Sequence, residues 1–217
     1  MRTQLPLLTL ALATLALVLP AFGEGVQGLL QYERGALAGG ELWRLFTQHW
    51  THWSAEHLVW DVLVFLALGA VCELRDRRRL LLTLAVSALA ISLALTILAP
   101  GLVTCRGLSG LDSALFALLA ADWLGWADLV RGRAGDGGWR RLTGGLALGL
   151  FLAKCGYEQA TGETLFVPVD ASGMVPVPLA HLVGFLSALF VAAVWPWLRG
   201  RAGLPQGWRR GGALQCC

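Results

Sequence analysis

Four polar residues in this chain have types and spacings that suit covalent catalysis. Ser109 stands in the tetrad Gly107-Leu108-Ser109-Gly110, His181 follows much later, and His57 precedes Asp61 by four residues. A serine hydroxyl is a weak nucleophile until a base takes its proton, and histidine is the usual base at neutral pH. The residue types therefore predict a serine nucleophile with a histidine base, provided that the fold brings them together.

The glycines beside the serine fit the same chemistry. Gly107 and Gly110 would let backbone and substrate approach Ser109 closely, because glycine has no side chain. A serine at a helix N-terminus also has free backbone N–H groups and a positive dipole end, which favour a developing oxyanion. Taken alone the tetrad is a weak signal, since Gly and Ser are common packing residues in membrane helices.

The elements that must position these residues are membrane spans. Of the 217 residues, 56% are hydrophobic and 14% are charged, which excludes a disordered chain and argues against an ordinary soluble domain. A span needs about 20 mostly apolar residues. The sequence predicts an all-α polytopic membrane protein, a single domain over residues 1–217 with six transmembrane helices, at about 5–22, 57–72, 80–99, 107–124, 142–157 and 179–198.

Two of these stretches have alternative interpretations. The first has the basic start, apolar centre and small-residue end of a signal peptide. The fifth is short and Gly-rich and would suit a re-entrant or interfacial segment, although Gly145-Leu146-Ala147-Leu148-Gly149 also forms a small-residue packing face. Residues 199–217 are expected to form a disordered cytoplasmic tail.

The basic residues predict the orientation, because cytoplasmic loops are rich in Arg and Lys. With a cytoplasmic N-terminus, four basic residues lie on or near the outside: Arg34, Arg44, Arg106 and Lys154. The other 13 lie inside, at positions 2, 75, 77, 78, 79, 131, 133, 140, 141, 199, 201, 209 and 210. Both termini are therefore expected to be cytoplasmic. The arginine runs act as topology signals and contacts to lipid phosphates, so no nucleic-acid partner is expected.

This topology places the polar residues at one depth. Ser109 lies near the outer end of the fourth span, His181 near the outer end of the sixth, and His57 and Asp61 share a face at the outer end of the second. Polar residues inside spans are costly and usually functional. Asp112 lies three residues after Ser109 on the same helix face. We expect it either to bond polar neighbours between helices or to support the site.

With these motifs in this order, the sequence resembles the rhomboid intramembrane serine proteases. That family has a six-span core, a Gly-x-Ser-Gly nucleophile at the start of the fourth span and a histidine base in the sixth. Its first outer loop has a Trp-Arg pair, two histidines five residues apart and then an asparagine. The corresponding segments here are Glu41-Leu42-Trp43-Arg44, the run from His52 through His57 to Asp61, Gly107-Leu108-Ser109-Gly110 and Ala180-His181-Leu182-Val183-Gly184.

The resemblance implies roles for individual residues. It implies that Ser109 is the nucleophile, His181 the general base, and His57 with the Ser109 backbone N–H the oxyanion hole. Trp43, Arg44 and His52 match structural positions of the first loop.

Three positions depart from the family pattern. Asp61 stands where most members have an asparagine donor, Ser113 where many have a tyrosine, and Ala188 where the sixth span has a second glycine. An ionised Asp61 only accepts hydrogen bonds, so it would serve as a donor only if burial kept it protonated.

The compact chain also resembles the rhombosortase subgroup, small bacterial rhomboids that process proteins with a C-terminal Gly-Gly anchor segment. The resemblance implies an integral protein of a bacterial inner membrane. Its implied substrates are transmembrane or C-terminally anchored proteins, cleaved near the outer face of the lipid bilayer. No cofactor and no metal is expected.

Two other function classes stay open at this point. A rhomboid-like pseudoprotease would bind transmembrane clients without cleaving them, although such proteins usually lack the serine or the histidine, and both are present here. A proton- or metal-handling carrier would use the spans' ionisable residues and the His49-Trp50-Thr51-His52 run, namely His49, His52, His57, Asp61, Asp112 and His181.

The five cysteines show no CxxC spacing, so they suggest neither a zinc site nor a disulfide framework. In the expected topology Cys105 and Cys155 both lie toward the outside. A disulfide between them is allowed if that compartment is oxidising, and two free thiols are the alternative.

Overall fold

The computed structural model describes residues 5–133, 138–162 and 177–201. This part of the chain is almost wholly helical, with one small two-stranded sheet. In chain order the elements are α1 (Leu7–Val18), η1 (Leu19–Phe22), α2 (Gly23–Leu30), β1 (Tyr32–Glu33), α3 (Arg34–Ala38), α4 (Arg44–Thr47), η2 (Gln48–Trp50), α5 (Ala55–Leu98), β2 (Thr104–Cys105), α6 (Ser109–Leu124), α7 (Trp126–Val130), α8 (Gly138–Thr161) and α9 (Pro178–Arg201).

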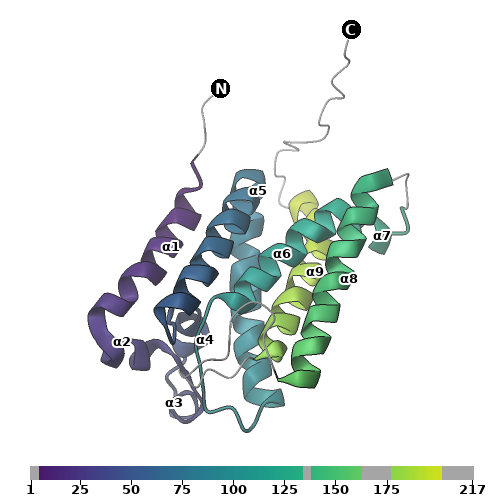
Figure 1. The fold of residues 1–217 in the computed structure, drawn as a ribbon. Coiled ribbons are helices and arrows are strands. Elements are labelled where there is room, and N and C mark those ends of the chain that lie inside the picture. Colours follow the sequence, from purple (N-terminus) through teal and green to yellow (C-terminus); the bar gives the residue numbers. More distant parts are fainter. Residues whose placement is uncertain (1–4, 134–137, 163–176, 202–217) are drawn as a thin grey trace.

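Helix α5 reverses direction at Asp76, which has non-helical backbone angles of φ −163° and ψ 95°. The Asp76 carboxylate accepts a hydrogen bond from the backbone N–H of Arg79 at 3.2 Å, so it caps the second half of the helix. The same carboxylate accepts from Trp195 of α9 at 3.1 Å. The two halves of α5 therefore run side by side in opposite directions (Figure 1).

The predicted stretches 57–72 and 80–99 are thus two helices that meet at a kink at Asp76. The polar run between them, Glu73 to Arg79, extends the two helices up to this kink. The other predicted stretches each fall on a helix. The first extends through η1 and α2 to Leu30, and the fifth lengthens at both ends into α8.

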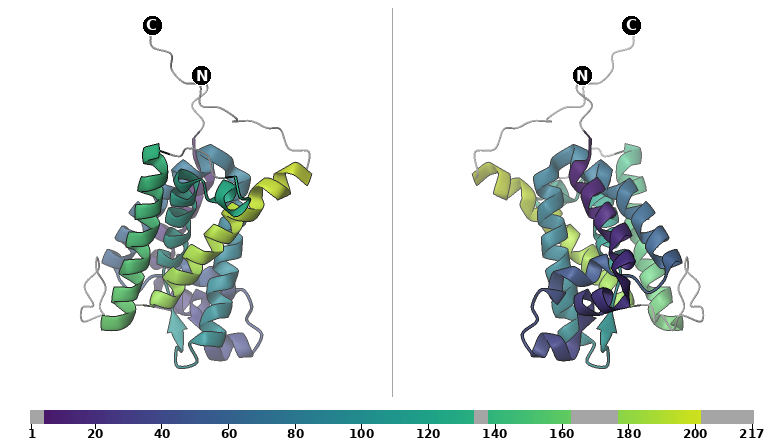
Figure 2. Two further views of the ribbon diagram at one scale, coloured as in Figure 1. Left: turned by 90° about the vertical axis from the view of Figure 1, so that its right-hand side faces the viewer. Right: turned by 90° about the vertical axis from the view of Figure 1, so that its left-hand side faces the viewer.

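Three helical segments of the described chain are long and apolar enough to cross a membrane: Leu7–Leu30, Ala55–Leu98 and Pro178–Gly200. Helix α6 lies between α5 and α9 and also contacts α8 (Figure 1). Helix α9 crosses the bundle at a marked tilt (Figure 2). The N-terminal half of α5 packs against α1, where the buried Glu73 accepts hydrogen bonds from the backbone N–H groups of Leu8 and Thr9.

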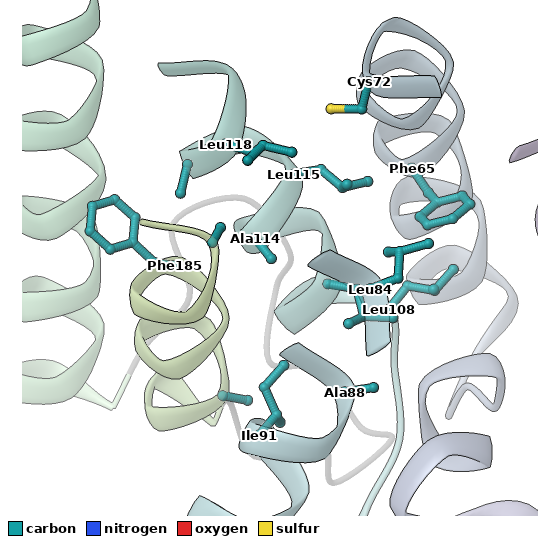
Figure 3. Close-up of a cluster of buried hydrophobic side chains, with 14 of the residues drawn as sticks. Phe65, Cys72, Leu84, Ala88, Ile91, Leu108, Ala114, Leu115, Leu118 and Phe185 are labelled. Carbon is teal, nitrogen blue, oxygen red and sulfur yellow. The ribbon is translucent and has the colours of Figure 1, made fainter. Parts of the chain in front are cut away.

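The apolar core forms where α5, α6 and α9 meet. Leu115 and Ala114 of α6 lie between Phe65 of α5 on one side and Phe185 of α9 on the other (Figure 3). All four side chains are at most 2% exposed. Because small residues line this face of α6, the helices approach closely, which is how helices associate within a membrane.

The segment between α2 and α5 covers one end of the bundle. Strand β1 pairs antiparallel with β2, with Tyr32 opposite Cys105. The Arg34 guanidinium donates to four backbone carbonyl groups, those of Leu95 and Thr96 in the last turn of α5 and of Ala99 and Leu102 just after it. It thereby ties the segment before α4 to the end of α5. Trp43 and Trp53 are partly exposed at this end, as expected for an interfacial segment.

Candidate active site

Ser109 and His181 lie in direct hydrogen-bond contact. The distance from Ser109 Oγ to His181 Nε2 is 3.0 Å. Ser109 is the first residue of α6, and His181 lies in the first turn of α9. The two residues are far apart in the sequence, so their contact depends on how α6 packs against α9. A serine and an imidazole nitrogen at this distance have the geometry of a nucleophile with its base.

Two glycines allow that packing. A Cβ atom on Gly184 of α9 would lie 2.0 Å from the backbone oxygen of Gly110 in α6. A Cβ on Gly110 would lie 2.8 Å from the Ile91 side chain and 3.3 Å from the backbone oxygen of Ala180. The helix backbones therefore touch immediately beside Ser109 and His181, and these two positions set the distance between them.

The start of α6 leaves backbone donors beside the serine. The carbonyl of Leu108 accepts from the N–H groups of Leu111 and Asp112, which closes the first helical turn. In the described part of the chain, the N–H groups of Ser109 and Gly110 have no acceptor. Both belong to the set of helix N-terminal donors that lack an intrahelical partner. Together with the helix dipole they favour negative charge near Ser109.

Asp61 gathers the two histidines of the predicted loop motif around one carboxylate oxygen. Its Oδ2 lies 3.2 Å from His52 Nε2 and 3.2 Å from His57 Nε2. The same oxygen accepts a hydrogen bond of 2.9 Å from the backbone N–H of Leu108. Asp61 therefore accepts from Leu108, and its position ties both histidines to the start of α6.

Gly107 is required by this cluster. Its φ of +127° lies in the region that favours glycine, and a Cβ there would lie 2.8 Å from His57 Cε1. The chain turns at Gly107 directly before the helix that carries Ser109. Any larger residue would collide with His57, which is 7% exposed, and would strain the backbone.

Glu158 is a site residue that the sequence motifs did not identify. It lies on α8 and its side chain is 1% exposed. Its Oε2 lies 3.4 Å from His181 Nδ1, on the side of the ring opposite Ser109. Lys154, one turn earlier, lies 2.7 Å from Glu158 Oε1. The i,i+4 spacing of Lys154 and Glu158 was visible in the sequence, but not the face on which they lie.

Two further predicted residues lie beside the site without joining the pair. Asp112 is buried, and its Oδ1 has no hydrogen-bond partner among the described residues. His49 lies in η2 with its Nε2 3.4 Å from the backbone oxygen of Ala88. Burial lowers the pKa of His49 to about 4, so it is neutral at physiological pH. Some of these residues would also serve a proton- or metal-handling carrier. Among them, His52 and His57 each lie 3.2 Å from Asp61, while His181 pairs with Ser109.

The Trp43-Arg44 pair holds the segment between α2 and α5 in place. Arg44 is 3% exposed. Its guanidinium donates to the Glu41 carboxylate at 2.7 Å and to the backbone oxygens of Gly28 and Gln31. Trp43 Nε1 donates to the backbone oxygen of Leu29 at 3.2 Å. These contacts fix the end of α2 against α4.

The allowed Cys105–Cys155 disulfide is not formed in the structure. Both cysteines are free thiols. Cys105 is held in the β1–β2 ladder opposite Tyr32, and Cys155 is buried on α8.

A cavity of about 1110 Å³ opens onto the serine and the histidine. Helices α5, α6, α8 and α9 and the segment before α6 all contribute to its wall. Apolar side chains such as Val64, Leu68, Phe116 and Phe151 form much of the lining, with polar groups gathered at the Ser109 end. A mostly apolar pocket with a few convergent polar groups is the usual form of a binding site.

Comparisons with known proteins identify the family of the chain. No curated protein matches the chain. The family model of the rhomboid domain matches residues 39–197, more than two thirds of the chain. The matched region contains the Trp43-Arg44 pair, the Asp61 cluster, Ser109 and His181. The chain therefore belongs to the rhomboid family of intramembrane serine proteases.

Proposed function

We propose that this protein is an intramembrane serine endopeptidase in which Ser109 is the nucleophile and His181 the general base. The observation that carries the proposal is the 3.0 Å contact between Ser109 Oγ and His181 Nε2 at the wall of the cavity. Family membership supports the reaction class, because rhomboids are serine proteases. The rest of the geometry suits each step of peptide-bond cleavage.

The first half-reaction forms an acyl-enzyme. His181 Nε2 takes the hydroxyl proton of Ser109 while Oγ bonds to the carbonyl carbon of the substrate, and the carbonyl oxygen becomes an oxyanion. When this intermediate collapses, the peptide C–N bond breaks and His181 gives its proton to the leaving nitrogen. Water, deprotonated by the same imidazole, then hydrolyses the ester and restores Ser109.

The oxyanion is stabilised by the start of α6 in this proposal. The N–H groups of Ser109 and Gly110 supply the donors, and the helix dipole adds favourable potential. His57 lines the cavity, and its Nε2 lies 3.2 Å from Asp61 Oδ2. We therefore assign Asp61 the task of holding Leu108, His52 and His57 in place, in contrast to the donor role of the family's asparagine.

We further propose six transmembrane segments, namely the Leu7–Leu30 segment, the two halves of α5, and α6, α8 and α9. The start of α1, the reversal of α5 and the end of α9 support this, because all lie at one end of the bundle. There Glu73 bonds to Leu8, and Arg199 lies 3.4 Å from Asp76. The arginine-rich run 75–79 lies at the same end, which favours the cytoplasmic side for both termini.

Membrane-anchored proteins are the proposed substrates, since Ser109 lies toward the other end of the bundle, the outer face in this topology. The resemblance to the rhombosortase subgroup extends the proposal to proteins with a C-terminal anchor segment in a bacterial inner membrane. A cleavage assay that compares a transmembrane reporter with a C-terminally anchored one separates these substrate types.

The proposal is tested by labelling the purified protein with a fluorophosphonate, which bonds to an activated serine with loss of fluoride. We expect a single adduct, and peptide mass spectrometry should place it on Ser109. Labelling requires neutral His181, because only the neutral imidazole can take the serine proton. Absence of an adduct in folded protein, or an adduct on another serine, contradicts the protease and favours the client-binding or carrier alternatives.

Asp61 gives a second prediction. Asp61→Asn should retain most of the activity, because the amide oxygen still accepts from the Leu108 N–H. Asp61→Leu should destabilise the fold by roughly 1–3 kcal/mol, the cost of leaving a buried donor without a partner. Thermal unfolding in detergent and reporter cleavage measure the two effects. If the Asn variant is folded but inactive, the negative charge itself is essential and our assignment of Asp61 is wrong.

A further inference from the structure

We infer that Glu158 is a positioning residue for His181, so that the site works as a Ser109–His181–Glu158 triad within the membrane-embedded bundle. The inference rests on the proposed function, since it assigns a role to a neighbour of the proposed base. Glu158 lies within the matched residues 39–197, but none of the motif segments that carry the resemblance contains it. One ring nitrogen of His181 lies against Ser109 and the other against Glu158.

The two nitrogens of His181 face different partners. Nε2 lies 3.0 Å from Ser109 Oγ, and Nδ1 lies 3.4 Å from Glu158 Oε2. To take the serine proton, Nε2 must be unprotonated, so the single proton of neutral imidazole must be on Nδ1. A carboxylate facing Nδ1 selects that tautomer and stabilises the imidazolium that forms during the reaction.

The 3.4 Å separation is within the range of an ion pair, and the buried Nδ1 makes no hydrogen bond among the described residues. Contacts of this kind in ligand-free sites are often long and shorten when the substrate is bound. Glu158 is held in place for the interaction. Its side chain is 1% exposed, and Lys154 lies 2.7 Å from Oε1. Lys154 offsets the charge of the buried carboxylate, which would otherwise be costly.

Lys154 Nζ lies 2.7 Å from Glu158 Oε1 and donates to Oε2, the oxygen that faces His181, at 2.8 Å. In Glu158→Gln the side chain is neutral whichever way the amide faces, so it no longer stabilises the imidazolium. An NH₂ group that faces Nδ1 would also favour the tautomer with the proton on Nε2, which cannot accept from Ser109. Asp61, His57 and Asp112 also line the cavity with Lys154 and Glu158, and they are unchanged in this variant.

The first experiment needs no variant and no catalysis. Nitrogen NMR of the ¹⁵N-histidine-labelled full chain reports the tautomer of each imidazole, with His181 assigned by its loss in His181→Ala. We expect the Nδ1–H tautomer for neutral His181 in the wild type. The Nε2–H tautomer would overturn the inference. Because this readout does not depend on activity, it decides the role of Glu158 even if the protein fails to label with fluorophosphonate.

The second experiment measures the labelling rate of Ser109 against pH. Glu158→Gln should lower the rate by between about 10-fold and about 10⁴-fold, the upper limit being the loss seen when the acid of a serine-protease triad becomes an amide. The acid limb of the profile should also move to lower pH, because the imidazolium loses a negative neighbour and keeps the positive Lys154. A purely structural role for Glu158 would lower the amount of folded protein without moving this limb.

The matched control is Glu56→Gln, the same chemical change at an exposed residue in the first turn of α5, which should match the wild type. If Glu158→Gln does not fold, Glu158→Asp keeps the charge and moves it away from the ring. Its rate should lie below that of the wild type with the acid limb nearly unmoved. A folded Glu158→Gln, or Glu158→Asp in its place, that labels at the wild-type rate would overturn the inference.

Discussion

Replacing either Ser109 or His181 by alanine should abolish cleavage of a membrane-anchored reporter while leaving the protein folded. The wild-type contact of 3.0 Å joins the two groups, so neither can act without the other. We expect a loss of roughly 10⁶-fold for each single variant, as in other serine proteases. The double variant should be little worse than either single one, because residues that act as a unit are not additive.

Reporter cleavage in reconstituted vesicles measures this effect, with thermal unfolding as the check that each variant is folded. A useful matched control is Ser113→Ala. Ser113 lies one turn after Ser109 in α6, and its hydroxyl donates to the backbone oxygen of Ser109. That bond is local to the helix, so the control should cleave at close to the wild-type rate. Substantial residual cleavage by folded Ser109→Ala would exclude the serine mechanism.

The second large effect is expected at the contact between α6 and α9. In Gly184→Ala the new Cβ would lie 2.0 Å from the backbone oxygen of Gly110, so the helices must separate. Overpacking of this kind costs typically about 1–3 kcal/mol of stability. Because Gly110 and Gly184 lie beside the site, the separation also moves His181 away from Ser109. A displacement of 1 Å can cost about 10²-fold in rate.

Gly149→Ala is the control for this change. Gly149 is also a helical glycine, on α8, and a Cβ there has no atom within 4 Å. We expect wild-type cleavage and an unfolding temperature that is unchanged or slightly higher, since alanine favours a helix over glycine. Unfolding midpoint and fluorophosphonate labelling rate should both fall for Gly184→Ala alone. If Gly184→Ala equals the wild type in both, close helix contact does not set the site geometry.

The sequence by itself determined the local features of this protein. Apolar runs of about 20 residues can satisfy their backbone in a membrane only as helices, so nearly every helix of the bundle was predictable, from α1 to α9. The motif around Ser109 and the position of His181 identified the pair that the structure brings together. Motif order alone placed Trp43, Arg44 and His52 in the segment before α5. These predictions depend on residue type and spacing, which the sequence contains directly.

Other features depend on contacts between distant segments and could not be predicted. Asp76 reverses α5 within a helical run, and its capping role needs the positions of Arg79 and Trp195. Asp61 stands where the family has a donor, but its Oδ2 accepts from the Leu108 N–H and lies 3.2 Å from the Nε2 atoms of His52 and His57.

Glu158 belongs to none of the sequence motifs, and only the packing of α8 places it against His181. The physical reason is common to these cases. A polar side chain takes its role from the groups that face it, and only the packing of the helices decides which groups those are.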